Sequence, residues 1–359
     1  MKAVPTSSLT PGMTLSKDVY TYNAQLLLPA GTQLTDKAIT KLTFYSIPFI
    51  YIRKDDPVPV LEPRESEDTY SARIKKSPAF RKFSTEFHKD VDKLRDVLND
   101  VVEKNAPLDI NTLLHDTLAL LDNTHGPIHI FDILHNMRQY DDLTYAHSMN
   151  VALICNVLAT WLGMNEEDIL LATQCGLLHD IGKLMIPEDI IKKPDKLTHQ
   201  EYKIAKTHAN EGYNILQKCH VDMHIANAAL LHHERCDGSG YPFGLTSNQI
   251  DPFAKIVAIA DVYDAMTSAR VYRGPLCPFT VIAMFESEGI QKYDARYILT
   301  FMENVLNTYI LNRVRLSDGR EGEVVLINKR FLSRPLVRCG NEYVDLSREP
   351  ASLTIEAII

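Results

Sequence analysis

Two pairs of neighbouring residues near the middle of the chain carry side chains suited to chemistry. His179 and Asp180 open the run His-Asp-Ile-Gly-Lys, and His232 and His233 open the run His-His-Glu-Arg-Cys-Asp-Gly-Ser-Gly-Tyr-Pro. The mostly apolar residues 169–178 predict a buried helix directly before the first pair. Burying an imidazole and a carboxylate there costs roughly several kcal/mol unless a partner compensates. A bound metal ion is the most economical compensation.

Seven histidine and aspartate side chains could ligate such a metal. Each is expected in or at the end of a helical segment, which supplies the rigidity that a preorganised site needs. Imidazoles combined with carboxylates suit Mn, Fe, Zn or Co, whereas oxygen ligands alone would indicate Mg or Ca. Seven ligands are too many for one ion and suit two, with Asp180 as the expected bridge because a carboxylate has two oxygens. The candidate ligands are His147, His179, Asp180, His208, His232, His233 and Asp261.

The elements that must position these residues form a helical domain. Between residues 110 and 312 one helical pattern follows another, with interruptions at prolines such as Pro127, Pro187 and Pro252. We therefore expect an all-helical domain over residues 110–312, and the chain as a whole is predicted to be mainly α.

Smaller modules are expected on both sides of this domain. Residues 1–53 alternate short apolar runs with turn residues, which predicts a small N-terminal α+β module with a role in contact or regulation. Residues 54–77 combine prolines with acidic residues and predict an extended linker. Residues 313–359 contain short strand patterns around a Ser-Asp-Gly turn, which predicts a small C-terminal β appendage.

Residues 78–109 predict an amphipathic helix that connects the linker to the helical domain. Between residues 78 and 103, apolar residues recur every three or four positions and form one apolar stripe. The stripe either packs on the helical domain or forms the seam of a homodimer. Packing is favoured, because heptad runs this short also occur in ordinary packed helices. The stripe consists of Phe80, Phe83, Phe87, Val91, Leu94, Leu98 and Val101.

The overall composition limits the partners and the location. The 359-residue chain has a formal net charge of -8, which argues against a nucleic-acid polymer as partner because such proteins carry a basic excess. No apolar run is long enough to span a membrane, and the first residues lack the apolar core of a secretion signal. The six cysteines are dispersed and are expected to be reduced. The sequence therefore predicts a cytoplasmic protein.

The order and spacing of the candidate ligands resemble those of the HD-GYP family, a branch of the HD superfamily of metal-dependent phosphohydrolases. The similarity runs from about Asp141 to Arg273 and rests on the motifs HDIGK and HHExxDGSGYP. Residues 1–53 are less strictly similar to a small domain that often precedes this catalytic domain. The resemblance implies that all seven candidate ligands bind metal.

The resemblance also implies roles in catalysis and in substrate binding. Asp180 and Lys183 would be catalytic, with Lys183 facing the scissile phosphate and sharing a helical face with Asp180 if the helix continues. A forked guanidinium suits phosphate binding, although a surface cation explains Arg273 equally well. The implied substrate-binding residues are Asp237, Gly238, Gly240, Tyr241, Arg270 and Arg273.

One position departs from the family pattern. Members that hold three metals place a glutamate four residues before the first histidine ligand, and here that position is Leu143. A leucine cannot ligate, so we expect two divalent ions. Iron and manganese are expected first and zinc is the alternative, because these metals share the same ligand types.

The implied activity is hydrolysis of the bacterial second messenger cyclic di-GMP to linear pGpG, with GMP as the product of a second cut. A hydroxide activated between the two metals would attack the phosphorus. Two alternatives stay open. The domain is either a cyclic di-GMP sensor with little turnover that signals to a protein partner through the terminal modules, or a hydrolase of another cyclic dinucleotide.

Overall fold

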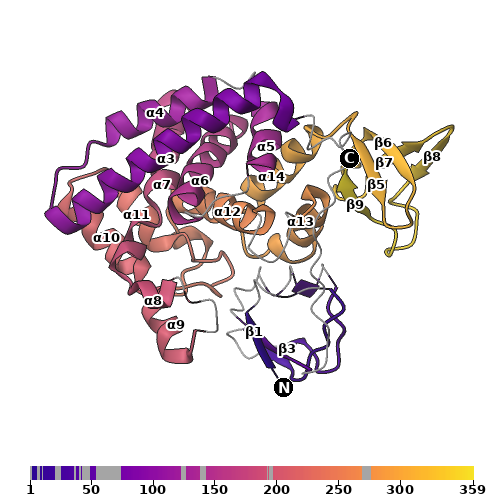
Figure 1. The fold of residues 1–359 in the computed structure, drawn as a ribbon, viewed down its shortest axis with the longest axis horizontal. Helices are drawn as coiled ribbons and strands as arrows, with labels where there is room; N and C mark the ends of the chain where they lie inside the picture. Colours follow the sequence, from indigo (N-terminus) through magenta and orange to yellow (C-terminus); the bar gives the residue numbers. More distant parts are fainter. Residues whose placement is uncertain are drawn as a thin grey trace.

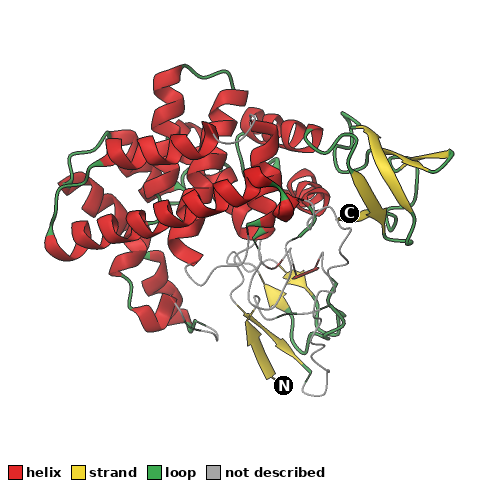
Figure 2. Cartoon of the chain, turned by 45° about the horizontal axis from the view of Figure 1, so that its top comes forward, coloured by secondary structure: helices red, strands yellow, loops and turns green. Residues whose placement is uncertain are grey.

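The computed structural model consists mainly of helices, with strands near both ends of the chain (Figure 2). This arrangement confirms the predicted fold class, a mainly α chain with a small N-terminal module and a C-terminal β-sheet. The residues that the structure describes are 2–5, 9, 11–20, 26–35, 38–39, 42, 49–53, 74–122, 127–137, 143–191, 193, 197–268 and 276–359.

The helical body contains both long helices and short turns of helix (Figure 1). In chain order its elements are α3 (Pro78–Lys104), α4 (Ile110–Asp122), α5 (Pro127–Asn136), α6 (Leu143–Trp161), α7 (Glu166–Leu178), η2 (Ile181–Met185), α8 (Glu188–Ile191), α9 (His199–Lys206), α10 (His208–Lys218), α11 (Met223–Leu231), η3 (Ser247–Gln249), α12 (Pro252–Thr267), α13 (Pro278–Met284), η4 (Phe285–Gly289) and α14 (Ala295–Asn307). None of these described helices is both long and apolar enough to cross a membrane.

Helices α6 and α7 pack closely at the centre of this body. A Cβ atom at Gly176 would lie 2.8 Å from the Cα of Ala152 and 3.0 Å from the Sγ of Cys155, so only a glycine permits this approach. Asn165 caps the N-terminus of α7 by accepting a hydrogen bond from the amide of Asp168. The close packing of α7 on α6 at Gly176 fixes the position of the C-terminal end of α7, and therefore where the residues after Leu178 lie.

The apolar stripe of α3 faces the core of its own chain. Phe83, Phe87, Leu94 and Leu98 are at most 2% exposed and belong to the same apolar cluster as α6 and α7. Ser77 caps the start of the helix and accepts from the amide of Phe80. The packing interpretation of this stripe is thus the one that the structure supports, and the interpretation as a dimer seam is wrong for these side chains, since they are already covered.

The terminal modules differ in how they join the helices. In the N-terminal module β1 (Lys2–Pro5) pairs with β4 (Phe49–Ile52), β2 (Val19–Tyr20) pairs with β3 (Leu26–Leu28), and a separate apolar cluster lies among them. The C-terminal sheet is antiparallel in the order β8-β7-β6-β5-β9, and its apolar face joins the main core. Its strands are β5 (Arg313–Leu316), β6 (Glu321–Leu326), β7 (Leu336–Cys339), β8 (Glu342–Asp345) and β9 (Ile355–Ile358).

A glutamate on η4 attaches this sheet to the helices. The carboxylate of Glu286 accepts hydrogen bonds from the backbone amides of Leu332 (2.5 Å) and Ser333 (3.1 Å), and from the Ser333 hydroxyl. These bonds join the loop between β6 and β7 to the helical body.

Candidate metal centre

The predicted ligands come from five helices and converge at one place. His147 lies on α6, His179 and Asp180 follow the last residue of α7, and Asp261 lies on α12. His208 is the first residue of α10, and His232 and His233 follow α11. In three overlapping sets of three residues, the ligand atoms lie within 4.8 Å of one another, and together these sets include all seven residues.

The first group surrounds one oxygen of Asp180. The Nε2 atom of His147 lies 3.1 Å from Asp261 Oδ1 and 3.8 Å from Asp180 Oδ2. The Nε2 atom of His179 lies 3.2 Å from the same Asp180 oxygen. Two imidazoles and two carboxylates thus face a common space.

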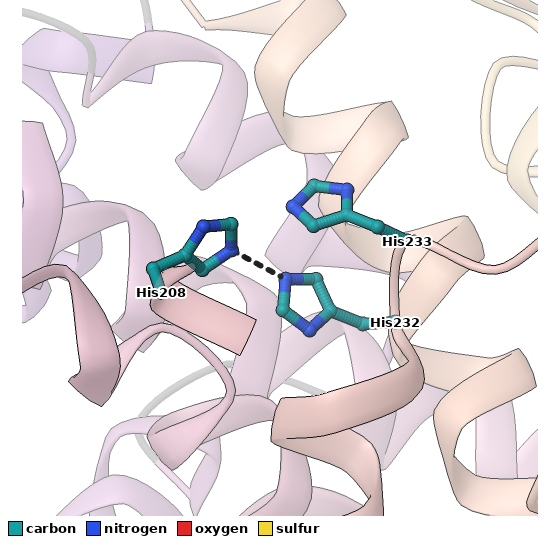
Figure 3. A group of neighbouring side chains, drawn as sticks. All are labelled: His208, His232 and His233. Atoms are coloured by element: carbon teal, nitrogen blue, oxygen red, sulfur yellow. Dashed lines mark hydrogen bonds between the residues drawn. The ribbon is translucent and has the colours of Figure 1, made fainter. Parts of the chain in front are cut away.

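The second group surrounds the other oxygen of Asp180. The Nε2 atoms of His208 and His232 lie 3.4 Å apart, and His233 lies beside them (Figure 3). Asp180 Oδ1 is 3.6 Å from His208 Nε2 and 3.7 Å from His232 Nε2. The two oxygens of Asp180 therefore face different groups, which is the arrangement a bridging carboxylate requires.

The backbone fixes the orientation of three of these rings. The Nδ1 atoms of His179 and His208 lie 2.7 Å from the carbonyl oxygens of Gly176 and Ala205. The Nδ1 atom of His232 lies 2.9 Å from the carbonyl of Ala229. Because a carbonyl only accepts, Nδ1 carries the proton in each ring and Nε2 presents its lone pair to the cluster, as metal-binding histidines do.

Asp264 fixes the orientation of the His147 ring in the same way. This residue was not identified from the sequence. Its Oδ2 atom lies 2.7 Å from His147 Nδ1, and its Oδ1 atom accepts from Asn150 Nδ2 at 3.0 Å. The spacing held a signal: Asp264 follows Asp261 by three residues on α12, so both carboxylates share one helical face.

Burial keeps the imidazoles of the second group neutral. It lowers the pKa of His208 and His233, and together with the neighbouring His179 it lowers the pKa of His232 to about 3. Neutral rings are the form in which histidine binds a metal.

The carboxylates are held in their ionised form. Burial opposes the charge of Asp180, but His179 and Lys183 outweigh it and hold the pKa of Asp180 well below its usual value. Burial likewise opposes the charge of Asp261, yet the neighbouring His147 lowers that pKa. The site therefore attracts positive charge of the kind a divalent ion supplies.

Two buried ligand atoms have no hydrogen-bond partner among the described residues and are suited to bind a metal ion. His179 Nε2 and Asp180 Oδ1 are fully enclosed, and neither has a hydrogen-bond partner among the residues that the structure describes. Leaving such atoms unbonded is costly, by roughly 1–3 kcal/mol each. Both atoms point at the space between the ligand groups, so the residues present suit a bound divalent ion.

Lys183 lies next to the cluster but not on a continuing helix. Helix α7 ends at Leu178, and Lys183 lies in the 3-10 turn η2, so the condition for a shared helical face, a continuing α-helix, is not met. Its Nζ still forms an ion pair with Asp180 Oδ2. The turn forms because Gly182 packs against α10, where an added Cβ would lie 1.9 Å from the carbonyl oxygen of His208.

The loop that follows the second histidine pair, residues 237–245 (the signature loop), contributes one ring to the cluster. Tyr241 stacks on His233, with ring centroids 4.6 Å apart and an interplanar angle of 21°. Gly238 has a φ of 80°, which favours glycine. Asp237 instead closes a local turn, because its Oδ1 accepts from the amide and the hydroxyl of Ser239.

Two predicted substrate-binding residues, Arg270 and Arg273, lie outside the described residues. Leu143, the position at which members with three metals carry a glutamate, is the first residue of α6 and precedes His147 by four residues.

The comparisons with known proteins concern the helical region that carries the site. Residues 133–297 match the family described as HD domain, which supports the predicted resemblance for this region of the chain. A solved structure described as Bd1817, a HDG"Y"P protein from Bdellovibrio bacteriovorus, has the same fold, with a TM-score of 0.50. That match covers 84% of this chain and 97% of the other at 18% identity.

Curated relatives of this chain include cyclic dinucleotide phosphodiesterases. The cyclic di-GMP phosphodiesterase PA4108 of Pseudomonas aeruginosa is 37% identical over 204 residues, which are 56% of this chain and 49% of that protein. The cyclic di-GMP phosphodiesterase of Thermotoga maritima is 40% identical over 177 residues, 48% of each chain. The 3'3'-cGAMP-specific phosphodiesterase 1 of Vibrio cholerae is 45% identical over 133 residues, 37% of this chain and 31% of that protein. The chain thus spans about half or less of the length of these relatives.

Proposed function

We propose that the chain is a metal-dependent phosphodiesterase that hydrolyses cyclic di-GMP to pGpG, with GMP as the product of a second cut. The observation that carries this proposal is the division of seven ligands, five of them buried and two half-buried, into two groups that share Asp180. The names of the curated relatives support the substrate class.

The metal content belongs to the same proposal. Two divalent ions, iron or manganese with zinc as the alternative, would be held by His147, His179 and Asp261 on one side and by His208, His232 and His233 on the other. Asp180 would bridge them. When bound, such ions supply a hydroxide at neutral pH and neutralise charge on the phosphate oxygens.

The protein's own side chains would do the remaining work. Lys183 lies beside Asp180 and is 29% exposed, so its ammonium group can reach a phosphate at the edge of the cluster and stabilise the developing charge. The ring of Tyr241 would bind the substrate next to the ligands. Asp264 would keep His147 oriented.

A second substrate has one observation in its favour. The Vibrio cholerae relative that is named as specific for 3'3'-cGAMP is 45% identical to this chain over the matched region. The sensor alternative, a signalling partner for the terminal modules and a cytoplasmic location stay predictions.

The test compares two substrates and two variants. Manganese- or iron-loaded protein is incubated with cyclic di-GMP and with 3'3'-cGAMP, and the products are separated by chromatography. We expect pGpG from cyclic di-GMP, and we expect Asp180→Ala to lose both metal and turnover. The control Asp116→Ala, which removes an ion-pair partner of Lys93 on the α3–α4 face, should keep both.

Stoichiometric binding of cyclic di-GMP without any product would identify a sensor instead. Full turnover by Asp180→Ala would refute the assignment of the site.

A further inference from the structure

The signature loop rests on a buried carboxylate that has no role in the scheme above. Glu234 follows the two histidines and is 2% exposed. Its Oε1 accepts from the amides of Phe243 (2.7 Å) and Gly244 (3.1 Å), and its Oε2 accepts from the amide of Leu245 (2.9 Å). One side chain therefore satisfies three consecutive backbone donors on the far side of the loop.

Two further contacts hold the backbone of the signature loop against residues 233–234. The amide of Tyr241 donates to the carbonyl oxygen of His233 at 3.2 Å. An added Cβ at Gly240 would lie 2.4 Å from the Cα of Glu234, so the glycine is required for this approach. The loop is thus attached to residues 233–234 both before and after Tyr241.

This attachment determines where the ring of Tyr241 lies. The ring stacks on His233, and the Nζ atom of Lys206 lies 4.6 Å from its centroid. With its backbone held on both sides, the ring is kept at the candidate metal centre rather than in solvent.

We propose that Glu234 is a positioning residue that holds Tyr241 against His233 and so preorganises the substrate side of the site. The inference rests on the proposed function for its kinetic consequence, but not for its structural one. Bonds to an ionised acceptor are stronger than those to a neutral amide, and a glutamine offers one acceptor oxygen where three donors converge. Glu234→Gln should therefore loosen residues 243–245 while it preserves the size of the side chain.

The chain provides a matched control in Glu286. It is also a glutamate that accepts from consecutive backbone amides, those of Leu332 and Ser333, but it attaches the C-terminal sheet. Glu286→Gln should lower the melting temperature as Glu234→Gln does, without a change at the signature loop. A purely structural role for Glu234 would make the two variants alike in substrate binding, although each would loosen a different segment.

The first measurement is hydrogen exchange of the full-length protein followed by mass spectrometry. We expect the amides of residues 243–245 to exchange roughly tenfold faster or more in Glu234→Gln, and at the wild-type rate in Glu286→Gln. If Glu234→Gln fails to fold, Glu234→Asp keeps the charge on a shorter side chain and should show a smaller acceleration. Unchanged exchange at 243–245 in the folded variant would overturn the proposal.

The second measurement is steady-state kinetics on cyclic di-GMP with metal analysis of the same samples. We expect KM to rise by about tenfold in Glu234→Gln with a smaller change in kcat, because weaker substrate binding raises KM. Metal content should equal that of the wild type. Loss of metal, or an equal rise of KM in Glu286→Gln, would overturn the positioning role. If the wild type cleaves no cyclic dinucleotide, the proposed function fails, and the exchange result still tests whether Glu234 holds residues 243–245.

Discussion

Replacing Asp264 by asparagine tests whether a carboxylate that bonds a ligating histidine raises the metal affinity of the candidate centre. Asp264 is 2% exposed and lies between two partners, with His147 Nδ1 at 2.7 Å and Asn150 Nδ2 at 3.0 Å. An asparagine of nearly the same shape has only one acceptor oxygen. Its oxygen can accept the hydrogen bond of His147 or that of Asn150 but not both. The substitution also removes the negative charge next to the His147 imidazole.

The size of the effect follows from the role of such partners. Loss of an outer-shell hydrogen bond to a ligating histidine costs about 10–100-fold in metal affinity. This corresponds to roughly 1.4–2.8 kcal/mol. We expect Asp264→Asn to weaken manganese binding by that factor, measured by calorimetric titration of metal-stripped protein, while the fold is preserved.

The control for Asp264→Asn is another aspartate with the same bond. Asp251 Oδ2 lies 2.7 Å from the Nδ1 atom of His224, and neither residue belongs to the ligand groups. Asp251→Asn should leave manganese affinity unchanged. The reasoning fails if the two variants bind manganese equally well, or if Asp264→Asn binds it within a factor of about two of wild type.

Two further predictions concern stability. In Gly182→Ala the new Cβ would lie 1.9 Å from the His208 carbonyl oxygen, so we expect a loss of about 3 kcal/mol or more in chemical denaturation. The loss should be smaller for Gly212→Ala, whose new Cβ would meet nothing nearer than the Ala229 Cβ and the Gly182 amide nitrogen, both at 3.3 Å. Burial and the charge of Asp116 raise the pKa of the half-buried Asp90 from 3.8 to about 6, so the folded state binds this proton more tightly and stability falls as the pH rises between these values. With solvent screening allowed for, Asp90→Asn should be about 1 kcal/mol more stable than wild type at pH 7 and equally stable at pH 3; equal stability at both pH values would contradict this.

The sequence predicted the helical body because its signals are local. The stripe of α3 could be seen from the spacing of Phe83, Phe87 and Leu94, since a helix of 3.6 residues per turn places them on one face. The period does not say what covers that face. The structure shows that the chain's own core covers it, which no local pattern could decide.

The candidate ligands were found because adjacent ionisable residues in apolar surroundings are conspicuous, whereas their supports were not. Asp264 resembles any polar residue on a helix until His147 is placed opposite it across 117 positions. The role of Glu234 depends on a loop that returns nine to eleven residues later. Whether the helix continued to Lys183 could not be decided from the sequence, because the close packing of Gly182 on α10 turns the chain there, and that contact is tertiary. The predicted domain boundaries and ligand roles stay predictions.

The convergence of five helices has a thermodynamic consequence for the candidate centre. His179 Nε2 and Asp180 Oδ1 are buried without hydrogen-bond partners among the described residues, and the packing of Gly176 against Ala152 prevents α7 from withdrawing them to solvent. The fold therefore holds polar atoms where only a ligand that bonds both can recover the cost of their burial. A ligand of that kind joins α6, α7, α10, α11 and α12 at once, so its binding free energy adds to the stability of the helical body.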